Sequence, residues 1–289
     1  MPLFYRSEYV NLGVSGATEA GAELSLVMGK HERNFPYHHA ESGWDDLLLC
    51  VGDERVSTQA RRLDFLRIAV DVRGPDTGTG RLVFDGPVTR ALGGDVHLRL
   101  DLRCSFVRFP PYQLAKRYNL LDALWVPGLR WRPFELSIEG GQSIELGDRT
   151  IALRPAFGEL EHGVTTNLRW KRAAFMYDFL CLATTTSDKP YALVRFISRA
   201  LDKRGFFGRL LDAYLRATAS ETLTFAKGTV LSGDEHGAST QSDGAEVLIE
   251  HVIPLGLADL QRQVVRTVDA SGHSVVGLRE IFTPRRTVP

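Results

Sequence analysis

Carboxylate and imidazole side chains that could do acid/base chemistry lie together in the stretch 158–179. Glu161 is followed directly by His162, with a glycine on either side of the short acidic run. Such a pair could exchange protons at the mouth of a pocket. In an extended strand adjacent side chains point to opposite faces, so Glu159 and Glu161 share one face and His162 takes the other. Either the carboxylates or the imidazole could thus enter a pocket, but not all together; for any one of them a solvated edge or loop is the favoured interpretation.

Asp178 is a second candidate for chemistry, because it interrupts a strand that is otherwise apolar on both faces. A carboxyl group among apolar neighbours has a raised pKa unless a cation or a hydrogen-bond donor pairs with it. Asp178 or Glu161 is thus the candidate general acid, with Tyr177 or His162 as a hydrogen-bond partner. A structural ion pair of Asp178 with an arginine such as Arg169 is the competing interpretation.

The stretch 31–46 holds several further polar and aromatic side chains, among them His39 and Trp44. Its proline and its adjacent histidines favour a surface loop that packs Trp44, ahead of a lining for a barrel opening and well ahead of a metal site. Aromatic and arginine side chains recur farther along the chain. The side chains expected to shape or line a pocket are Trp44, Trp131, Trp170, Arg169 and His39.

Composition excludes several classes of function. The 289 residues contain 35 Lys+Arg and 35 Asp+Glu, so the net charge of zero argues against a general nucleic-acid binder. No apolar run is long enough for a membrane span, and no signal peptide is recognisable. Nucleotide, hydrolase and zincin motifs are absent, and the 3 cysteines have no metal-ligand spacing. We expect a cytoplasmic protein with buried thiols and with no cofactor or metal.

Period-two alternation of apolar and polar residues is the main signal for the elements that position these side chains. It runs through 96–106 and recurs in many segments of both halves, which predicts a large antiparallel assembly. Glycine pairs such as Gly93-Gly94 mark tight turns. Residues 134–154, with Gly140-Gly141 and Gly147-Asp148 between alternating runs, are predicted to form a three-stranded meander.

Two segments, 113–126 and 198–218, have helical instead of alternating periodicity. The second carries Phe207, Leu210 and Leu211 on one stripe together with several basic residues. A basic amphipathic helix can lie on a membrane, contact a partner or cap a pocket. We expect instead that its apolar face packs over the end of a barrel.

These patterns predict an all-β fold, a lipocalin-like barrel pair with two accessory helices, and a β-sandwich is the alternative. The predicted halves are residues 1–135 and residues 136–289, each barrel-like, with the helix 198–218 in the second.

The layout of the chain resembles the lipocalin-like two-barrel proteins that include carotenoid 1,2-hydratase (hydroxyneurosporene synthase). The resemblance is carried by the run Gly158-Glu159-Leu160-Glu161-His162-Gly163, which leads through Arg169-Trp170 to Tyr177-Asp178-Phe179. It implies a pocket for an apolar small molecule, and cyclisation, hydration or isomerisation by acid/base groups on an isoprenoid or polyketide-like substrate, as in bacterial secondary metabolism.

Three functions are therefore expected in order. The first is a cofactor-independent enzyme, with a hydrophobic small molecule bound in a β-barrel pocket. The second is a lipocalin-like carrier or sensor that binds such a ligand unchanged. The third is an interaction module in which the helix 198–218 contacts a membrane or a partner.

Overall fold

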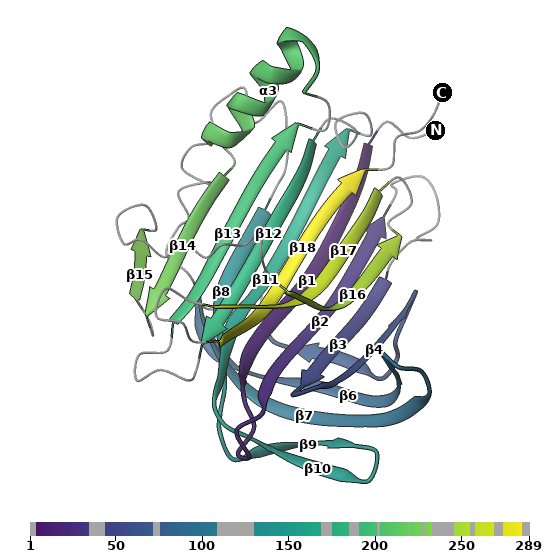
Figure 1. Ribbon diagram of the computed structural model, residues 1–289. Helices are drawn as coiled ribbons and strands as arrows, with labels where there is room; N and C mark the ends of the chain where they lie inside the picture. The colour runs from purple at the N-terminus through teal and green to yellow at the C-terminus, as the bar shows by residue number, and fades with distance from the viewer. Residues whose placement is uncertain are drawn as a thin grey trace.

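Two antiparallel sheets make up nearly all of the computed structural model (Figure 1). It describes residues 4–34, 44–71, 76–108, 130–168, 175–184, 191–200, 203–218, 220–226, 229–232, 246–254, 258–268 and 274–284. The prediction of an all-β, antiparallel fold is confirmed.

The first sheet closes into a barrel. Its strands pair in the order β7–β8–β11–β1–β2–β3–β4–β6, and β6 pairs again with β7, which completes a ring of eight. The ring strands are β1 (Phe4–Ala17), β2 (Glu23–Asn34), β3 (Trp44–Val51), β4 (Glu54–Ala60), β6 (Thr77–Arg90), β7 (Asp95–Arg108), β8 (Arg130–Ile138) and β11 (Ala156–Leu168). Three short strands extend it: β5 (Leu66–Ala69) on β6, and β9 (Gln142–Leu146) and β10 (Arg149–Leu153) beside β7.

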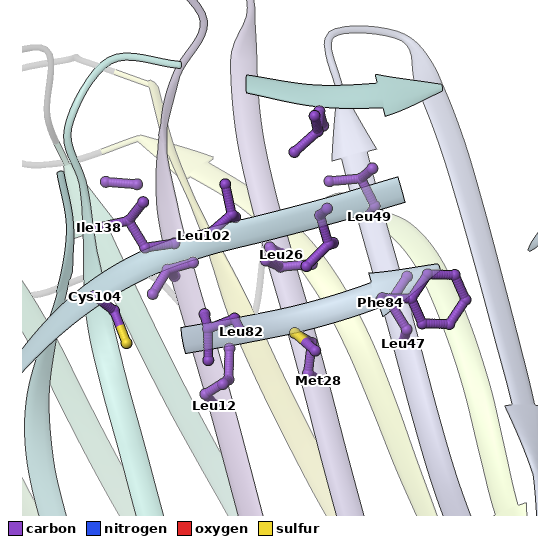
Figure 2. Close-up of a cluster of buried hydrophobic side chains, with 14 of the residues drawn as sticks. Leu12, Leu26, Met28, Leu47, Leu49, Leu82, Phe84, Leu102, Cys104 and Ile138 are labelled. Atoms are coloured by element: carbon purple, nitrogen blue, oxygen red, sulfur yellow. The ribbon is translucent and has the colours of Figure 1, made fainter. Parts of the chain in front are cut away.

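Alternation along each strand fills the barrel with apolar side chains. On β1, Leu12 points into the barrel, as do Met28 of β2 and Phe84 of β6, and all three are at most 1% exposed (Figure 2). Burial of this kind is worth about 25 cal/mol per Å² of apolar surface, so the packed interior is the main source of the barrel's stability. The predicted strand at 96–106 lies within β7, and Gly93-Gly94 forms the β6–β7 turn at positive φ.

The predicted three-stranded meander over 134–154 is wrong in one respect. β9 and β10 form the expected hairpin at Gly147, but β8 and β9 do not pair with each other. β8 and β9 both pair with the same edge of β7, one after the other. Gly140-Gly141 therefore separates two strands that run in the same direction and does not form a hairpin turn. The Gln142 side chain spans the interruption, because its amide bonds both the N–H and the C=O of Arg103.

The second sheet has seven strands in the order β15–β14–β13–β12–β18–β17–β16. They are β12 (Phe175–Thr184), β13 (Tyr191–Ala200), β14 (Ser220–Ala226), β15 (Thr229–Ser232), β16 (Glu246–Pro254), β17 (Ala258–Val268) and β18 (Ser274–Pro284). Within the described ranges its two edge strands, β15 and β16, do not pair with each other. The change of sheet falls between Leu168 and Phe175; the division into domains at 135/136 stays a prediction.

The helix expected at 198–218 is shorter than predicted. Residues 198–200 continue β13, because they pair with β12, and the helix α3 (Gly205–Thr218) begins at a glycine with a φ of 76°. α3 packs on β13 and β14, yet Phe207 and Leu210 stay exposed, so the prediction that the apolar face packs on the protein is wrong for these two residues. The helix predicted at 113–126 lies outside the described residues.

The second sheet lies across the outside of the barrel, with β12 and β18 against β1 and β2 (Figure 1). On β1, Asn11 and Gly13 alternate with the inward Leu12 and face the second sheet. A Cβ at Gly13 would lie 3.1 Å from the Cβ of Leu278 on β18, so the backbones approach closely here. The layer between barrel and second sheet is where buried polar groups gather.

Candidate functional site

A fully buried arginine, Arg262 of β17, stands at the centre of this layer at 0% exposure. Its Nη1 donates to Oδ1 of Asp46 over 2.5 Å and its Nε to Oε2 of Glu280 over 3.1 Å. Its Nη2 lies 2.8 Å from Nε2 of His31. A guanidinium has donors only, so Nε2 of His31 accepts and the ring proton sits on Nδ1. Arg262 thus joins β17 and β18 to β2 and β3 of the barrel.

Two glutamates of β11 extend this group along the layer. Nδ2 of Asn11 donates to Oε1 of Glu161 over 3.0 Å and reaches Oε1 of Glu280 over 3.4 Å, which links Glu161 through Glu280 to Arg262. Glu159 is 3% exposed, and its Oε1 has no hydrogen-bond partner within the described parts of the chain. We call these seven residues the interface cluster: Asn11, His31, Asp46, Glu159, Glu161, Arg262 and Glu280.

Burial and charge both disfavour full ionisation of the interface cluster. Burial raises the pKa of Glu159 well above its usual range, and the carboxylates of Glu161 and Glu280 raise it further. Burial also raises the pKa of Asp46 to about 6, although Arg262 opposes that shift. The cluster contains four carboxyl groups and one guanidinium, so it favours retention of at least one proton. Among the described residues no cation opposes the raised pKa of Glu159, so Glu159 is the carboxyl group that we expect to retain this proton.

Glycines make room for two of the large side chains. A Cβ on Gly29 of β2 would fall 2.0 Å from Nη1 of Arg262, so only glycine lets the guanidinium lie on that strand. A Cβ on Gly163 would fall 2.1 Å from the ring of Tyr9, which stacks on His31 with 5.8 Å between ring centroids. Tyr9 thereby holds the imidazole that accepts from Arg262.

Apolar side chains from both sheets surround the interface cluster. Trp44, at the start of β3, packs against the buried group of Ile253, Leu260 and Phe282. Leu278 and Phe179 lie on the same face as Glu280, at 3% and 4% exposure. The interface cluster is therefore a group of polar side chains enclosed by apolar ones, so water solvates a charge on Glu159 or Asp46 poorly.

Of the four predicted catalytic residues, the structure places only Glu161 in the interface cluster. His162 points to the other face of β11, as expected from the alternation, and its Nε2 lies 2.9 Å from Oε1 of Glu8. Asp178 accepts two hydrogen bonds from Arg279 of β18, at 3.0 and 2.6 Å, on the face of the second sheet opposite to Glu280. The partner is thus an arginine much farther along the chain than Arg169. The side chain of Tyr177 lies outside the described residues.

The predicted pocket-lining residues are only partly described. Trp44 flanks the interface cluster, next to His31 in the β2–β3 register. The side chain of Trp131 and the whole of Trp170, Arg169 and His39 lie outside the described residues. The thiols of Cys50 and Cys104 are free and buried, as expected, and burial raises the pKa of Cys104 to about 11.

Sequence reasoning missed the centre of the cluster, Arg262 with Asp46 and Glu280. A local signal exists for Arg262 and Glu280, because each occupies an apolar position of an alternating strand. Arg262 stands between Leu260 and Val264, and Glu280 between Leu278 and Phe282. A single charge at an apolar position predicts a buried partner. Which partner it is depends on strand pairing, since Arg262 and Asp46 are 216 residues apart.

In the described part of the chain, no group of three or more His, Cys, Asp and Glu side chains is arranged to hold a metal ion. No helix there is both long and apolar enough to cross a bilayer.

Comparison with models of protein families and with curated proteins finds no match. Among solved structures, a protein of Nitrosomonas europaea provisionally named AttH is 13% identical, with a TM-score of 0.38 over 96% of this chain and 91% of that one. CghA is 10% identical, with a TM-score of 0.43 over 97% of this chain and 88% of that one. A structure of CghA with Sch210972 gives 0.44 over the same shares. The fold assignment rests on the strand pairing itself.

Proposed function

We propose that the protein binds a hydrophobic small molecule at the interface cluster and catalyses its cyclisation, hydration or isomerisation by acid/base groups, without a cofactor. The observation that carries this proposal is Glu159. It is a buried carboxyl group with a raised pKa and an oxygen free of hydrogen bonds among the described residues, set between two other carboxylates. A carboxylic acid kept uncharged in an apolar layer is a competent proton donor near neutral pH.

In the proposed reaction Glu159 protonates a carbon–carbon double bond or an oxygen of the substrate. A new C–H or O–H bond forms, and Glu159 becomes a carboxylate. The carboxylates of Glu161 and Glu280 stabilise the positive charge that develops on the substrate. Loss of a proton from the cation, back to a carboxylate, completes an isomerisation or cyclisation, whereas capture of water followed by loss of a proton completes a hydration.

The other residues of the cluster position these carboxylates. Arg262 holds Glu280, and Asn11 donates to both Glu161 and Glu280, so the carboxylate oxygens are fixed before the substrate arrives. We assign the proton donor to Glu159 and not to Asp178, because Asp178 is ion-paired with Arg279. The apolar side chains around the cluster favour an apolar substrate, and the family resemblance of the run 158–163 points to an isoprenoid or polyketide-like one.

Native mass spectrometry of compounds that co-purify with the protein tests this proposal. Glu159→Gln keeps a neutral group of the same size, so the fold should be retained while proton donation is lost. We expect this variant to retain the substrate, and the parent protein to retain the product. After extraction, substrate and product of a hydration differ in mass. Substrate and product of an isomerisation or cyclisation have the same mass and are distinguished by chromatographic retention.

Glu145→Gln is the matched control, because Glu145 is 54% exposed on the outside of the barrel. It should behave as the parent protein does. Recovery of one unchanged compound from the parent and from Glu159→Gln would assign the protein to the carriers and refute catalysis by Glu159. Absence of any small molecule from all three proteins, with none bound on addition of apolar compounds, would refute the ligand site.

A further inference from the structure

The first half of α3 presents an apolar face that points away from the protein. Phe206, Phe207 and Leu210 are 68%, 82% and 56% exposed. Leu210 follows Phe206 by four residues and Phe207 by three, so it lies beside both of them on the helix surface. The two phenylalanine rings contact each other edge to face, with 5.7 Å between centroids. In Figure 1, α3 lies beyond the ends of β13 and β14, at the margin of the second sheet.

The orientation of this half of α3 is the reverse of that expected for a helix packed on a globular protein. Such a helix buries its apolar stripe and exposes its polar face. Here the buried side chain is Asp212, at 8% exposure, whose Oδ1 accepts from the N–H of Ala200 over 3.0 Å. Nζ of Lys203 lies 3.7 Å from the same oxygen. This anchoring of Asp212 turns the phenylalanines outward.

The charges beside the apolar face are basic. Lys203, Arg204 and Arg209 are exposed, and Asp212, the only acidic residue in Gly205–Thr218, points into the protein. Exposed aromatic rings flanked by lysine and arginine match the boundary between the acyl chains and the anionic headgroups of a bilayer. We propose that the first half of α3 is a docking surface for an anionic lipid membrane. This inference is independent of the proposed function.

Co-sedimentation of the full-length protein with vesicles tests the proposal. We expect binding to vesicles of equal parts phosphatidylglycerol and phosphatidylcholine, and much weaker binding to phosphatidylcholine alone. The double variant Phe206→Ser/Phe207→Ser should lower the partition coefficient at least about tenfold, because two exposed rings no longer enter the acyl region. Arg209→Glu should lower it by roughly tenfold on anionic vesicles only, because it replaces an attraction with a repulsion.

Leu92→Ser is the matched control, since Leu92 is fully exposed at the β6–β7 turn, away from α3. It should bind vesicles as the parent protein does. All the altered side chains are exposed, so circular dichroism should show an unchanged fold. Equal binding by the parent and the double variant would overturn the proposal. A dimer or a protein complex that the double variant abolishes, without vesicle binding by the parent, would overturn it as well.

Discussion

At the scale of single residues, the interface cluster concentrates a large electrostatic cost in a small volume. Arg262, Asp46 and Glu280 are at most 2% exposed, so each would be expensive to bury alone. They are tolerated because the guanidinium donates to both carboxylates and to His31. A buried ion pair of this kind adds little net stability, but the removal of one member leaves the others unpaired.

Arg262→Met should therefore destabilise the protein by about 3–5 kcal/mol, because Asp46 and Glu280 would remain buried without their cation. Urea unfolding followed by circular dichroism measures the change. Arg81→Met is the matched control, since Arg81 forms an ion pair with Asp101 on the exposed outside of the barrel and should change stability little. Equal effects of the two substitutions would contradict the assigned importance of Arg262.

His251 should make stability depend on pH. It pairs with Arg262 in the β16–β17 register, and burial together with that positive charge lowers its pKa from 6.5 to about 4. The unfolded chain takes up the proton first, so stability is lost as the pH falls from about 6.5 to about 4, by at most about 3 kcal/mol.

His251→Gln should remove this loss, which urea unfolding at a series of pH values would reveal. The raised pKa of Asp46 acts in the opposite sense, because its protonation stabilises the folded state as the pH falls below about 6. The difference between the variant and the parent isolates the contribution of His251, since Asp46 is common to both. Parallel stability curves for the two proteins would contradict the account.

Residues of the site differ in how far sequence could predict them. Glu161 and its shared face with Glu159 follow from alternation within one strand, as does the opposite orientation of His162. The ion pair of Asp178 was foreseen as an alternative, but its partner Arg279 is 101 residues away and could not be chosen from nearby arginines. Local periodicity gives the face on which a side chain lies; it does not give the strand on the other side of the interface.

At the scale of elements, the contact between β2 and the Arg262 side chain of β17 requires a residue without a side chain at position 29. Gly29 lies on the face of β2 that meets the second sheet, and the Arg262 guanidinium occupies the place where a Cβ would stand. Because the guanidinium lies directly on the β2 backbone, neither β2 nor Arg262 can move without a clash or a loss of contact.

Gly29→Ala should destabilise the protein by about 1–3 kcal/mol, because the methyl group displaces Arg262 from its carboxylate partners. In the background of Arg262→Met the same change should cost clearly less, since the flexible methionine can move away. Urea unfolding of the two single variants and the double variant provides the cycle. Additive effects would show that the added methyl group clashes with something other than Arg262.

Prediction of the elements succeeded where the periodicity of one strand was sufficient and failed where pairing mattered. The alternating run 96–106 and the turn at Gly93-Gly94 are present as β7 and the β6–β7 hairpin. The meander at 134–154 failed because β7, far longer than β8 or β9, offers one edge long enough for both. The residues 198–200 have helical periodicity but are held as strand by β12.

At the scale of the whole molecule, the protein consists of a closed barrel and a second sheet laid across it. The barrel interior is filled by apolar side chains such as Leu12, Met28 and Phe84, so the polar groups suited to chemistry lie outside it, on the surface that meets the second sheet. An antiparallel, all-β, barrel-like fold was predictable from strand count and alternation. The position of the candidate site between the sheets was not, because it follows from which barrel strands the second sheet covers.

We infer that the layer between the barrel and the second sheet keeps Glu159 as an uncharged carboxylic acid near neutral pH. Infrared spectroscopy of the parent protein, Glu159→Gln and Glu145→Gln measures this directly, since a protonated carboxyl group absorbs apart from carboxylates and amides. We expect a protonated-carboxyl band at neutral pH that disappears in Glu159→Gln and persists in Glu145→Gln. The same band in Glu159→Gln as in the parent, or no such band in the parent, would contradict it.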